Sequence, residues 1–141
     1  MRDYPVVTEE KVRFSDVDVF GHLNNAVFLQ FFEQARVAYF EEVALFGGKE
    51  RGDQNLVVAE NLCRYLAEGG YGDLVRCGAR FSKLGNKSCV QEYRLEVAGK
   101  AIAEGHTVMV YYDFLNRRSE PLPDELKARI REIEARVGRT I

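Results

Sequence analysis

Histidine and cysteine are scarce in this chain of 141 residues, which has only two histidines and three cysteines. Without a CxxC pair or an HExxH sequence, we expect no metal site. The cysteines Cys63, Cys77 and Cys89 are odd in number and widely spaced, which is typical of reduced thiols and not of a disulfide framework. No serine lies in a GxSxG sequence, and no Walker sequence is present. Any chemistry must therefore use carboxylates, amides or backbone N–H groups.

An excess of charge of one sign is also lacking, since the formal net charge is −2. This balance gives no general attraction to nucleic acid or to an anionic membrane. The longest apolar stretch is interrupted by Gln30 and Glu33, too early for a transmembrane helix, and the N-terminal residues 1–7 lack the apolar core of a secretory signal. We therefore expect a cytoplasmic protein, with one domain spanning 1–141 and neither nucleic acid nor membrane as a partner.

A long helix is predicted from Asn24 to about Phe46. Its polar positions fall close to one stripe, and almost every other position is apolar; the stripe consists of Gln30, Glu33, Gln34 and Glu41. So wide an apolar surface predicts burial on most of the circumference. The pair Gly47-Gly48 is expected to end this helix.

The remaining sequence predicts mostly strands. Polar–apolar alternation and turn residues place them at 5–14, 54–66, 73–82, 89–97 and 101–114, and an amphipathic helix follows at about 123–137. Gly85-Asn86 and Gly99-Lys100 are the expected turns between the last three strands. The strand at 101–114 is apolar on both faces near its end, so we expect it inside the sheet. A helix that is apolar nearly all round can be buried only if a curved antiparallel sheet wraps it, which predicts an α+β fold.

Acids and amides gather just before the long helix, in RFSDVDVFGHLNN at residues 13–25. Asn24 is a favoured N-cap, and the first backbone N–H groups beyond it, including that of Asn25, lack intrahelical partners. These donors sit at the positive end of the helix dipole, and Asp16 and Asp18 lie just upstream. A carboxylate beside unpaired N–H groups suits acyl chemistry. The simpler interpretation, that these residues only cap the helix and form the turn, remains open.

The same stretch, followed by FLQFFEQAR, resembles the opening motif of the hotdog-fold acyl-CoA thioesterases, in the 4-hydroxybenzoyl-CoA thioesterase-like group. That motif has the form R-F-x-D-x-D-x-x-G-H-x-N-N, and the resemblance continues in order through 71–95, 103–113 and 120–126. It implies a curved antiparallel sheet around a central helix, with a C-terminal helix. It also implies hydrolysis of a thioester to a carboxylic acid and free coenzyme A. No cofactor is expected, because coenzyme A is part of the substrate.

The resemblance also implies roles for individual residues. Asp18 corresponds to the carboxylate that acts on the thioester, as nucleophile or as general base for water, and the backbone N–H of Asn25 to the donor that polarises the carbonyl. Asp16 is expected to shape the turn. The other motif positions expected to contact the substrate are Gly21, His22 and Asn24. Plant acyl-carrier-protein thioesterases carry an asparagine where this chain has Phe20, which argues against a catalytic role for His22.

The resemblance also implies that segment 83–88 binds the carrier of the acyl group. Relatives place basic residues there against coenzyme A phosphates, so Lys87, with Lys83 and Ser88, is the candidate contact. Acyl-CoA is the expected substrate, and acyl carrier protein is an alternative carrier because both present phosphopantetheine. A homodimer or homotetramer is expected, since hotdog sheets join edge to edge. The alternative function is a non-hydrolytic hotdog domain that binds acyl-CoA or acyl carrier protein, and no residue specifies the acyl group.

Overall fold

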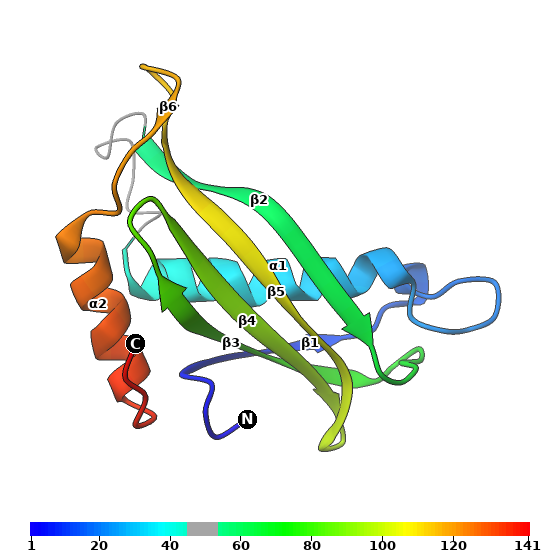
Figure 1. Ribbon diagram of the computed structural model, residues 1–141. Helices are drawn as coiled ribbons and strands as arrows, with labels where there is room; N and C mark the ends of the chain where they lie inside the picture. Colours follow the sequence, from blue (N-terminus) through cyan, green and yellow to red (C-terminus); the bar gives the residue numbers. More distant parts are fainter. Residues whose placement is uncertain (45–53) are drawn as a thin grey trace.

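The computed structural model describes residues 1–44 and 54–141, which form one antiparallel sheet and two helices (Figure 1). The elements in chain order are β1 (Val6–Lys11), a 3-10 turn (Phe14–Asp16), α1 (Asn25–Glu42), β2 (Gln54–Tyr65), β3 (Leu74–Leu84), β4 (Ser88–Val97), β5 (Lys100–Asp113), β6 (Arg118–Ser119) and α2 (Asp124–Ala135). Within the sheet the order is β1-β3-β4-β5-β2, and β6 pairs with β5.

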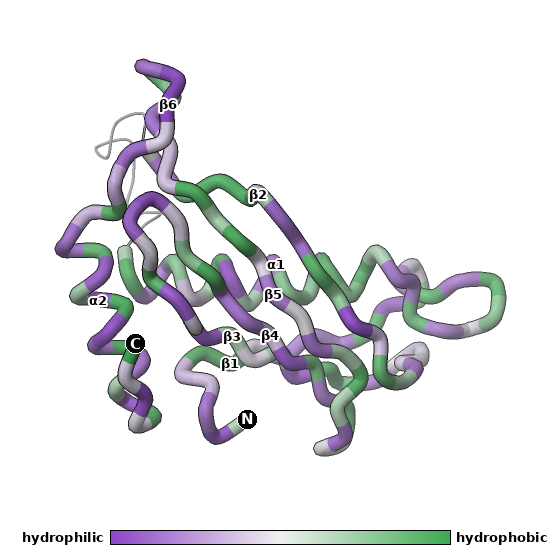
Figure 2. Tube along the Cα trace, in the orientation of Figure 1, coloured by the Kyte–Doolittle hydropathy of each residue, from purple (hydrophilic) through white to green (hydrophobic). Residues whose placement is uncertain are grey.

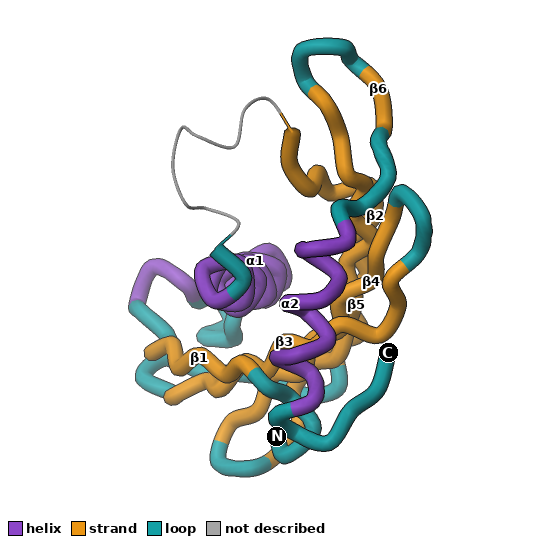
Figure 3. The backbone as a smooth tube through the Cα atoms, turned by 90° about the vertical axis from the view of Figure 1, so that its left-hand side faces the viewer, coloured by secondary structure: helices purple, strands orange, loops and turns teal. Residues whose placement is uncertain are grey.

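The sheet curves around α1, as the view along this helix shows (Figure 3). The apolar side chains of α1 are buried against it, whereas the predicted polar stripe from Gln30 to Glu41 is exposed. One close approach requires a glycine: a Cβ at Gly105 in β5 would lie 2.6 Å from the ring of Phe32 and 2.1 Å from the carbonyl oxygen of Leu62. The expected arrangement of a curved antiparallel sheet around a buried helix is confirmed.

Glu134, on the C-terminal helix α2, ties that helix to α1 and the sheet. Its side chain is fully buried, and Oε1 accepts hydrogen bonds from the Tyr39 hydroxyl (2.7 Å) and the Phe81 N–H (2.6 Å). Oε2 accepts from Nε of Arg139 at 2.9 Å. The amphipathic helix predicted at about 123–137 buries its apolar side chains Leu126, Ile130 and Ile133.

Several predicted boundaries differ from the structure. The helix α1 ends at Glu42, earlier than expected, and Gly47-Gly48 lies outside the described residues. The first strand ends at Lys11, because the N–H of Val12 donates to the carbonyl of Asp73 and the chain then turns. The turn before β5 is centred on Ala98 and Gly99, whose φ angles of 48° and 78° suit a tight hairpin, so the expected Gly99-Lys100 turn is one residue late. Strand β5 lies between β4 and β2, so the prediction that this strand is inside the sheet is confirmed.

Candidate active site

The loop that carries Asp18 is closed by its own backbone. The N–H of Asp18 donates to the carbonyl of His22 (2.8 Å), and the N–H of Gly21 donates to the carbonyl of Asp18 (3.0 Å). Gly21 has a φ of +77°, a conformation that favours glycine. Gly21 therefore shapes the loop, and it is not among the residues that line the adjacent cavity.

The carboxylate of Asp18 has one oxygen held and one oxygen free. Oδ1 accepts hydrogen bonds from the N–H groups of Phe20 (2.9 Å) and His22 (3.1 Å). Oδ2 has no hydrogen-bond partner among residues 1–44 and 54–141, and the residue is exposed. The loop therefore fixes the orientation of the carboxylate and leaves Oδ2 available for a ligand or water.

The start of α1 provides an unpaired donor beside this carboxylate. The side chain of Asn24 accepts from the N–H of Ala26 (3.0 Å), which confirms the predicted N-cap, and its carbonyl accepts from the N–H of Val27 (2.9 Å). The N–H of Asn25 donates to no atom in the part of the chain that the structure describes. Asn24 is thus occupied with capping, and the N–H of Asn25 is the first free donor at the positive end of the helix.

The buried side chain of Asp16 stabilises the same loop. The residue is only 2 % exposed, and Oδ2 accepts from the N–H of Arg13 at 2.8 Å. The Arg13 guanidinium donates to both carboxylate oxygens, at 2.9 and 3.1 Å, and these bonds lower the pKa of Asp16. The carbonyl of Asp16 accepts from the N–H of Asn24 at 2.9 Å. Asp16 therefore organises the turn, as expected for the first aspartate.

A cavity of about 480 Å³ brings the main candidates together. It is lined by Asp18, His22, Leu23, Asn25, Phe28, Tyr65, Leu66, Ala67 and Glu68. The exposed carboxylate and the helix start thus face one volume that also has an apolar wall. That arrangement matches what the sequence suggested for acyl chemistry: a carboxylate, an unpaired N–H group and room for an apolar group.

Tyr65 is a site residue that the sequence did not reveal. Its hydroxyl donates to the carbonyl of Asn25 at 3.1 Å, and its ring meets that of Phe28 edge-on with centroids 5.0 Å apart. No motif marks this tyrosine, because its contact joins residues 40 positions apart in the sequence.

The glycine-rich turn at 68–73 supports the Asp18 loop. The N–H of Leu23 donates to the carbonyl of Gly69 (2.7 Å), and His22 forms a β-bridge with Gly70. Nε2 of His22 lies 3.2 Å from Oε2 of Glu68, and both side chains are substantially exposed. The turn is therefore part of the site's scaffold.

The predicted carrier-binding residues lie elsewhere in the chain. Lys83, Lys87 and Ser88 lie at the β3–β4 turn. This turn is at the opposite end of the sheet from the start of α1 (Figure 1). The eleven-residue strand β3 separates the two ends by about 35 Å. One chain alone does not bring these residues to the cavity that contains Asp18.

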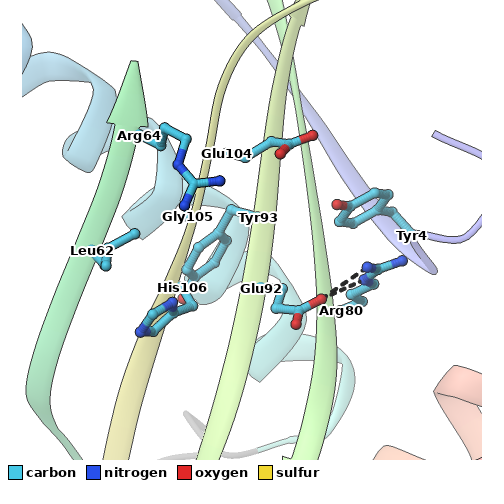
Figure 4. Close-up of a pocket in the computed structure, with 9 residues that line it drawn as sticks. All are labelled: Tyr4, Leu62, Arg64, Arg80, Glu92, Tyr93, Glu104, Gly105 and His106. Atoms are coloured by element: carbon cyan, nitrogen blue, oxygen red, sulfur yellow. Dashed lines mark hydrogen bonds and ion pairs between the residues drawn. The ribbon is translucent and has the colours of Figure 1, made fainter. Parts of the chain in front are cut away.

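A second cavity, of about 300 Å³, lies on the outer face of the sheet (Figure 4). Several of its charged side chains already have partners: Arg80 pairs with Glu92 at 2.9 Å, and Glu104 with Arg94 at 2.6 Å. Nε2 of His106 lies 2.8 Å from Oε1 of Glu60. Because these carboxylates are paired, the Asp18 cavity is the better candidate for catalysis.

In residues 1–44 and 54–141, no group of three or more histidine, cysteine, aspartate or glutamate side chains is placed to hold a metal ion. Neither described helix has the length and apolar character needed to cross a membrane.

Comparison with known proteins identifies the family and the fold. The family model for the thioesterase-like superfamily matches residues 12–130. A thioesterase from Thermus thermophilus, solved in complex with coenzyme A and zinc, is 35 % identical, with a TM-score of 0.86 and 100 % coverage of both chains. The long-chain acyl-CoA thioesterase FadM of Escherichia coli (strain K12) is 27 % identical over 128 residues, which are 89 % of this chain and 97 % of FadM. The uncharacterised protein YsmA of Bacillus subtilis (strain 168) is 31 % identical over 117 residues, 82 % of this chain and 78 % of YsmA.

Fold and comparisons together define a hotdog-fold thioester hydrolase. The chain belongs to the thioesterase-like superfamily. The resemblance drawn from the opening motif is therefore confirmed, and the non-hydrolytic alternative is set aside.

Proposed function

We propose that this protein hydrolyses acyl-CoA thioesters in the cavity beside the start of α1. The observation that carries this proposal is the free Oδ2 of Asp18 in the cavity that Asn25 also lines. Coenzyme A in the Thermus thermophilus relative and the acyl-CoA substrate of FadM support coenzyme A as the carrier. The proposed location remains the cytosol, which suits the free thiols of Cys63, Cys77 and Cys89.

In the proposed reaction the N–H of Asn25 donates to the thioester carbonyl oxygen. The negative charge that develops on this oxygen is stabilised by the N–H and the positive end of the helix dipole. Oδ2 of Asp18 either attacks the carbonyl carbon directly or removes a proton from a water molecule that attacks it. The carbon–sulfur bond then breaks, and coenzyme A leaves as the thiol after its sulfur takes up a proton. On the direct route the acyl group remains on Asp18 as a mixed anhydride, and a water molecule then hydrolyses this anhydride to the carboxylic acid and the free aspartate. Leu23, Phe28 and Leu66 supply apolar contacts for the acyl group.

A homodimer formed through β2 belongs to the same proposal. Strand β2 is a twelve-residue edge that exposes Val58, Leu62 and Tyr65. Figure 2 shows hydrophobic stretches along β2, separated by a hydrophilic one. The opposite edge, β1, is only six residues long and carries charges at Glu9, Glu10 and Lys11. Charge and short length protect an edge from pairing, so β2 is the edge that a second copy would extend.

The test is thiol release from a panel of aromatic and aliphatic acyl-CoAs by the parent protein and by Asp18→Asn. The asparagine keeps a carbonyl oxygen to accept from Phe20 and His22, so the loop should be preserved while the carboxylate is lost. We expect kcat to fall by about 10²- to 10⁴-fold, while coenzyme A still raises the melting temperature. Equal rates for the two proteins would refute the role of Asp18, and no release from any acyl-CoA by the parent would refute the proposed substrate class.

A further inference from the structure

The guanidinium of Arg36, on the helix α1, is buried between this helix and the sheet. Arg36 is 8 % exposed and is the only buried lysine or arginine in residues 1–44 and 54–141. Its Nη1 donates to two uncharged oxygens, the hydroxyl of Tyr93 (3.3 Å) and Oγ1 of Thr107 (3.2 Å). Its Nε donates to no atom in the same described residues. Uncharged groups therefore hold this buried cation in place of a close carboxylate.

The ion pair of Arg36 is long and exposed. Its Nη2 lies 3.4 Å from Oε2 of Glu33, and the Glu33 side chain is 62 % exposed. For comparison, the fully buried carboxylate of Glu134 lies 2.9 Å from Nε of Arg139. A buried charge costs free energy unless it is closely paired. A further anionic group placed at Arg36 would therefore be bound favourably.

A second donor without a partner belongs to the same cluster. Gln91 of β4 is fully buried, and its Oε1 accepts from the Tyr93 hydroxyl at 3.1 Å. Its Nε2 has no hydrogen-bond partner in the part of the chain that the structure describes. Oγ1 of Thr107, which lies opposite Gln91 in the sheet, donates to Oδ1 of Asn61 on β2 at 2.7 Å. Both hydroxyl protons are thus used within the cluster, and the donors that remain, on Arg36 and Gln91, favour a ligand with anionic oxygens.

This cluster lies on the same side of the molecule as the cavity beside the start of α1. Tyr65 lines the cavity and contacts Asn25, and Asn61 projects from the same face of β2, about 13 Å away along the strand. On the helix, Arg36 lies about three turns beyond Asn25 and therefore on the same side of α1. Between Asn61 and Tyr65, Cys63 is only partly buried. The inner face of β2 thus leads from the cavity to the buried guanidinium.

We infer that Arg36 binds a carboxylate at the far end of the acyl group, so that the preferred substrates are ω-carboxyacyl-CoA thioesters, the coenzyme A monothioesters of dicarboxylic acids. The thioester carbonyl lies at the N–H of Asn25, and the acyl chain runs along the inner face of β2. A span of about 13 Å corresponds to roughly ten carbon–carbon bonds of an extended chain. The terminal carboxylate takes the place of Glu33 and accepts hydrogen bonds from the guanidinium. This inference names the substrate class for the proposed acyl-CoA hydrolysis and rests on it.

The first experiment compares pairs of acyl-CoAs of equal chain length, with and without a terminal carboxylate. Chain lengths run from about six to about fourteen carbons, and thiol release gives kcat/KM for each substrate. We expect the parent to prefer the carboxylate-bearing substrate about tenfold at a length of about ten carbons. Arg36→Met should lose this preference, because methionine fills the space without supplying a cation.

The outcomes of this comparison separate the inference from the proposed function. A parent that hydrolysed the unsubstituted acyl-CoAs equally well or better at every length would overturn the inference and leave the proposed function standing. A preference that persisted in Arg36→Met would also overturn it. If the parent hydrolysed neither kind of substrate, the proposed function would fail and the inference with it.

The second experiment leaves Arg36 in place, because replacing a buried arginine can impair folding. Glu33→Gln removes the competing carboxylate, and the control Glu41→Gln removes another exposed glutamate from the same helix. We expect Glu33→Gln to lower KM for the ω-carboxyacyl-CoA about two- to fivefold relative to the unsubstituted acyl-CoA, and Glu41→Gln to keep the parent ratio. An unchanged ratio in Glu33→Gln, or an equal shift in both variants, would overturn the inference.

Discussion

The hydroxyl of Tyr65, the last residue of β2, donates a hydrogen bond of 3.1 Å to the carbonyl of Asn25, the first residue of α1. The ring of Tyr65 also packs edge-on against Phe28, one turn further along the helix. The edge strand therefore fixes the end of α1 that carries the proposed oxyanion donor. One side chain of the edge strand thus contacts both the carbonyl of Asn25 and the ring of Phe28 at the start of the helix.

Removing the Tyr65 hydroxyl should weaken catalysis more than stability. In Tyr65→Phe the ring contact with Phe28 remains, but the carbonyl of Asn25 loses the hydrogen bond from β2. Since such a hydrogen bond contributes about 0.5–1.5 kcal/mol, we expect kcat to fall about two- to tenfold with little change in KM. Steady-state kinetics provide the measurement, with Tyr71→Phe as the control because that ring is 67 % exposed and lines no part of the cavity. Equal kcat values for Tyr65→Phe and the parent would show that the contact does not position the donor.

The cap of α1 should be detectable as a contribution to stability. Asn24→Ala leaves the N–H of Ala26 without its partner, and we expect the free energy of unfolding to fall by about 1 kcal/mol. Asn24→Asp keeps an accepting oxygen and should remain close to the parent. Urea denaturation of the three proteins tests this, and equal losses in both variants would show that the cap is not the cause.

The helix start was predictable from sequence because capping is a local interaction. Asn24 was predicted as the cap from its residue type. The free N–H of Asn25 was predicted because the first four backbone N–H groups of any helix lack intrahelical partners. Tyr65 and the turn at 68–73 could not be found in this way, since they reach the site only through tertiary contacts. The end of α1 was misplaced for a related reason: apolar residues continue to Phe46, so periodicity alone gave no stop at Glu42.

The position of the predicted carrier-binding residues shows a second limit of sequence reasoning. Lys83, Lys87 and Ser88 were chosen by resemblance, which carries no information about the distance to Asp18 in one chain. The strand order puts them at the far end of β3, so one chain alone does not bring them to the cavity that contains Asp18.

Gly105 should not tolerate even an added methyl group. Its Cβ would lie 2.1 Å from the carbonyl oxygen of Leu62 and 2.6 Å from the ring of Phe32, so β2, β5 and α1 would have to move apart. We expect Gly105→Ala to lower the free energy of unfolding by about 3 kcal/mol or more. Gly70→Ala is the control, since its Cβ would meet nothing closer than 3.8 Å. Thermal unfolding of both variants measures the difference, and similar melting temperatures would contradict the packing argument.

Removing the buried carboxylate of Glu134 should destabilise the protein, mainly because its hydrogen-bond donors lose their acceptor. Glu134→Ala would leave the N–H of Phe81 and the hydroxyl of Tyr39 without partners in the core, at a cost of about 3–5 kcal/mol. Tyr39→Phe removes one donor and leaves the carboxylate bonded to the others, so we expect a loss of about 1–2 kcal/mol. Because the two residues share one contact, the double variant should lose less than the sum of the single variants. Strictly additive losses in chemical denaturation would contradict this coupling.

The Asp16 carboxylate should make the free energy of unfolding depend on pH in the acid range. Hydrogen bonds from Arg13 lower its pKa in the folded state, so the folded protein binds this proton less readily than the unfolded chain. The resulting stabilisation is fully present above the unfolded pKa, about 3.9, and is lost as the pH falls through the lower folded pKa.

Asp16→Asn, which cannot titrate, should therefore be less stable than the parent by a constant amount above about pH 5. The difference should shrink as the pH falls below about 4, and urea denaturation at a series of pH values measures it. Arg13→Ala should reduce the same pH dependence, because it removes the main cause of the lowered pKa. A gap between the parent and Asp16→Asn that stayed constant down to about pH 2 would mean that the stabilisation by Asp16 does not come from its ionised form.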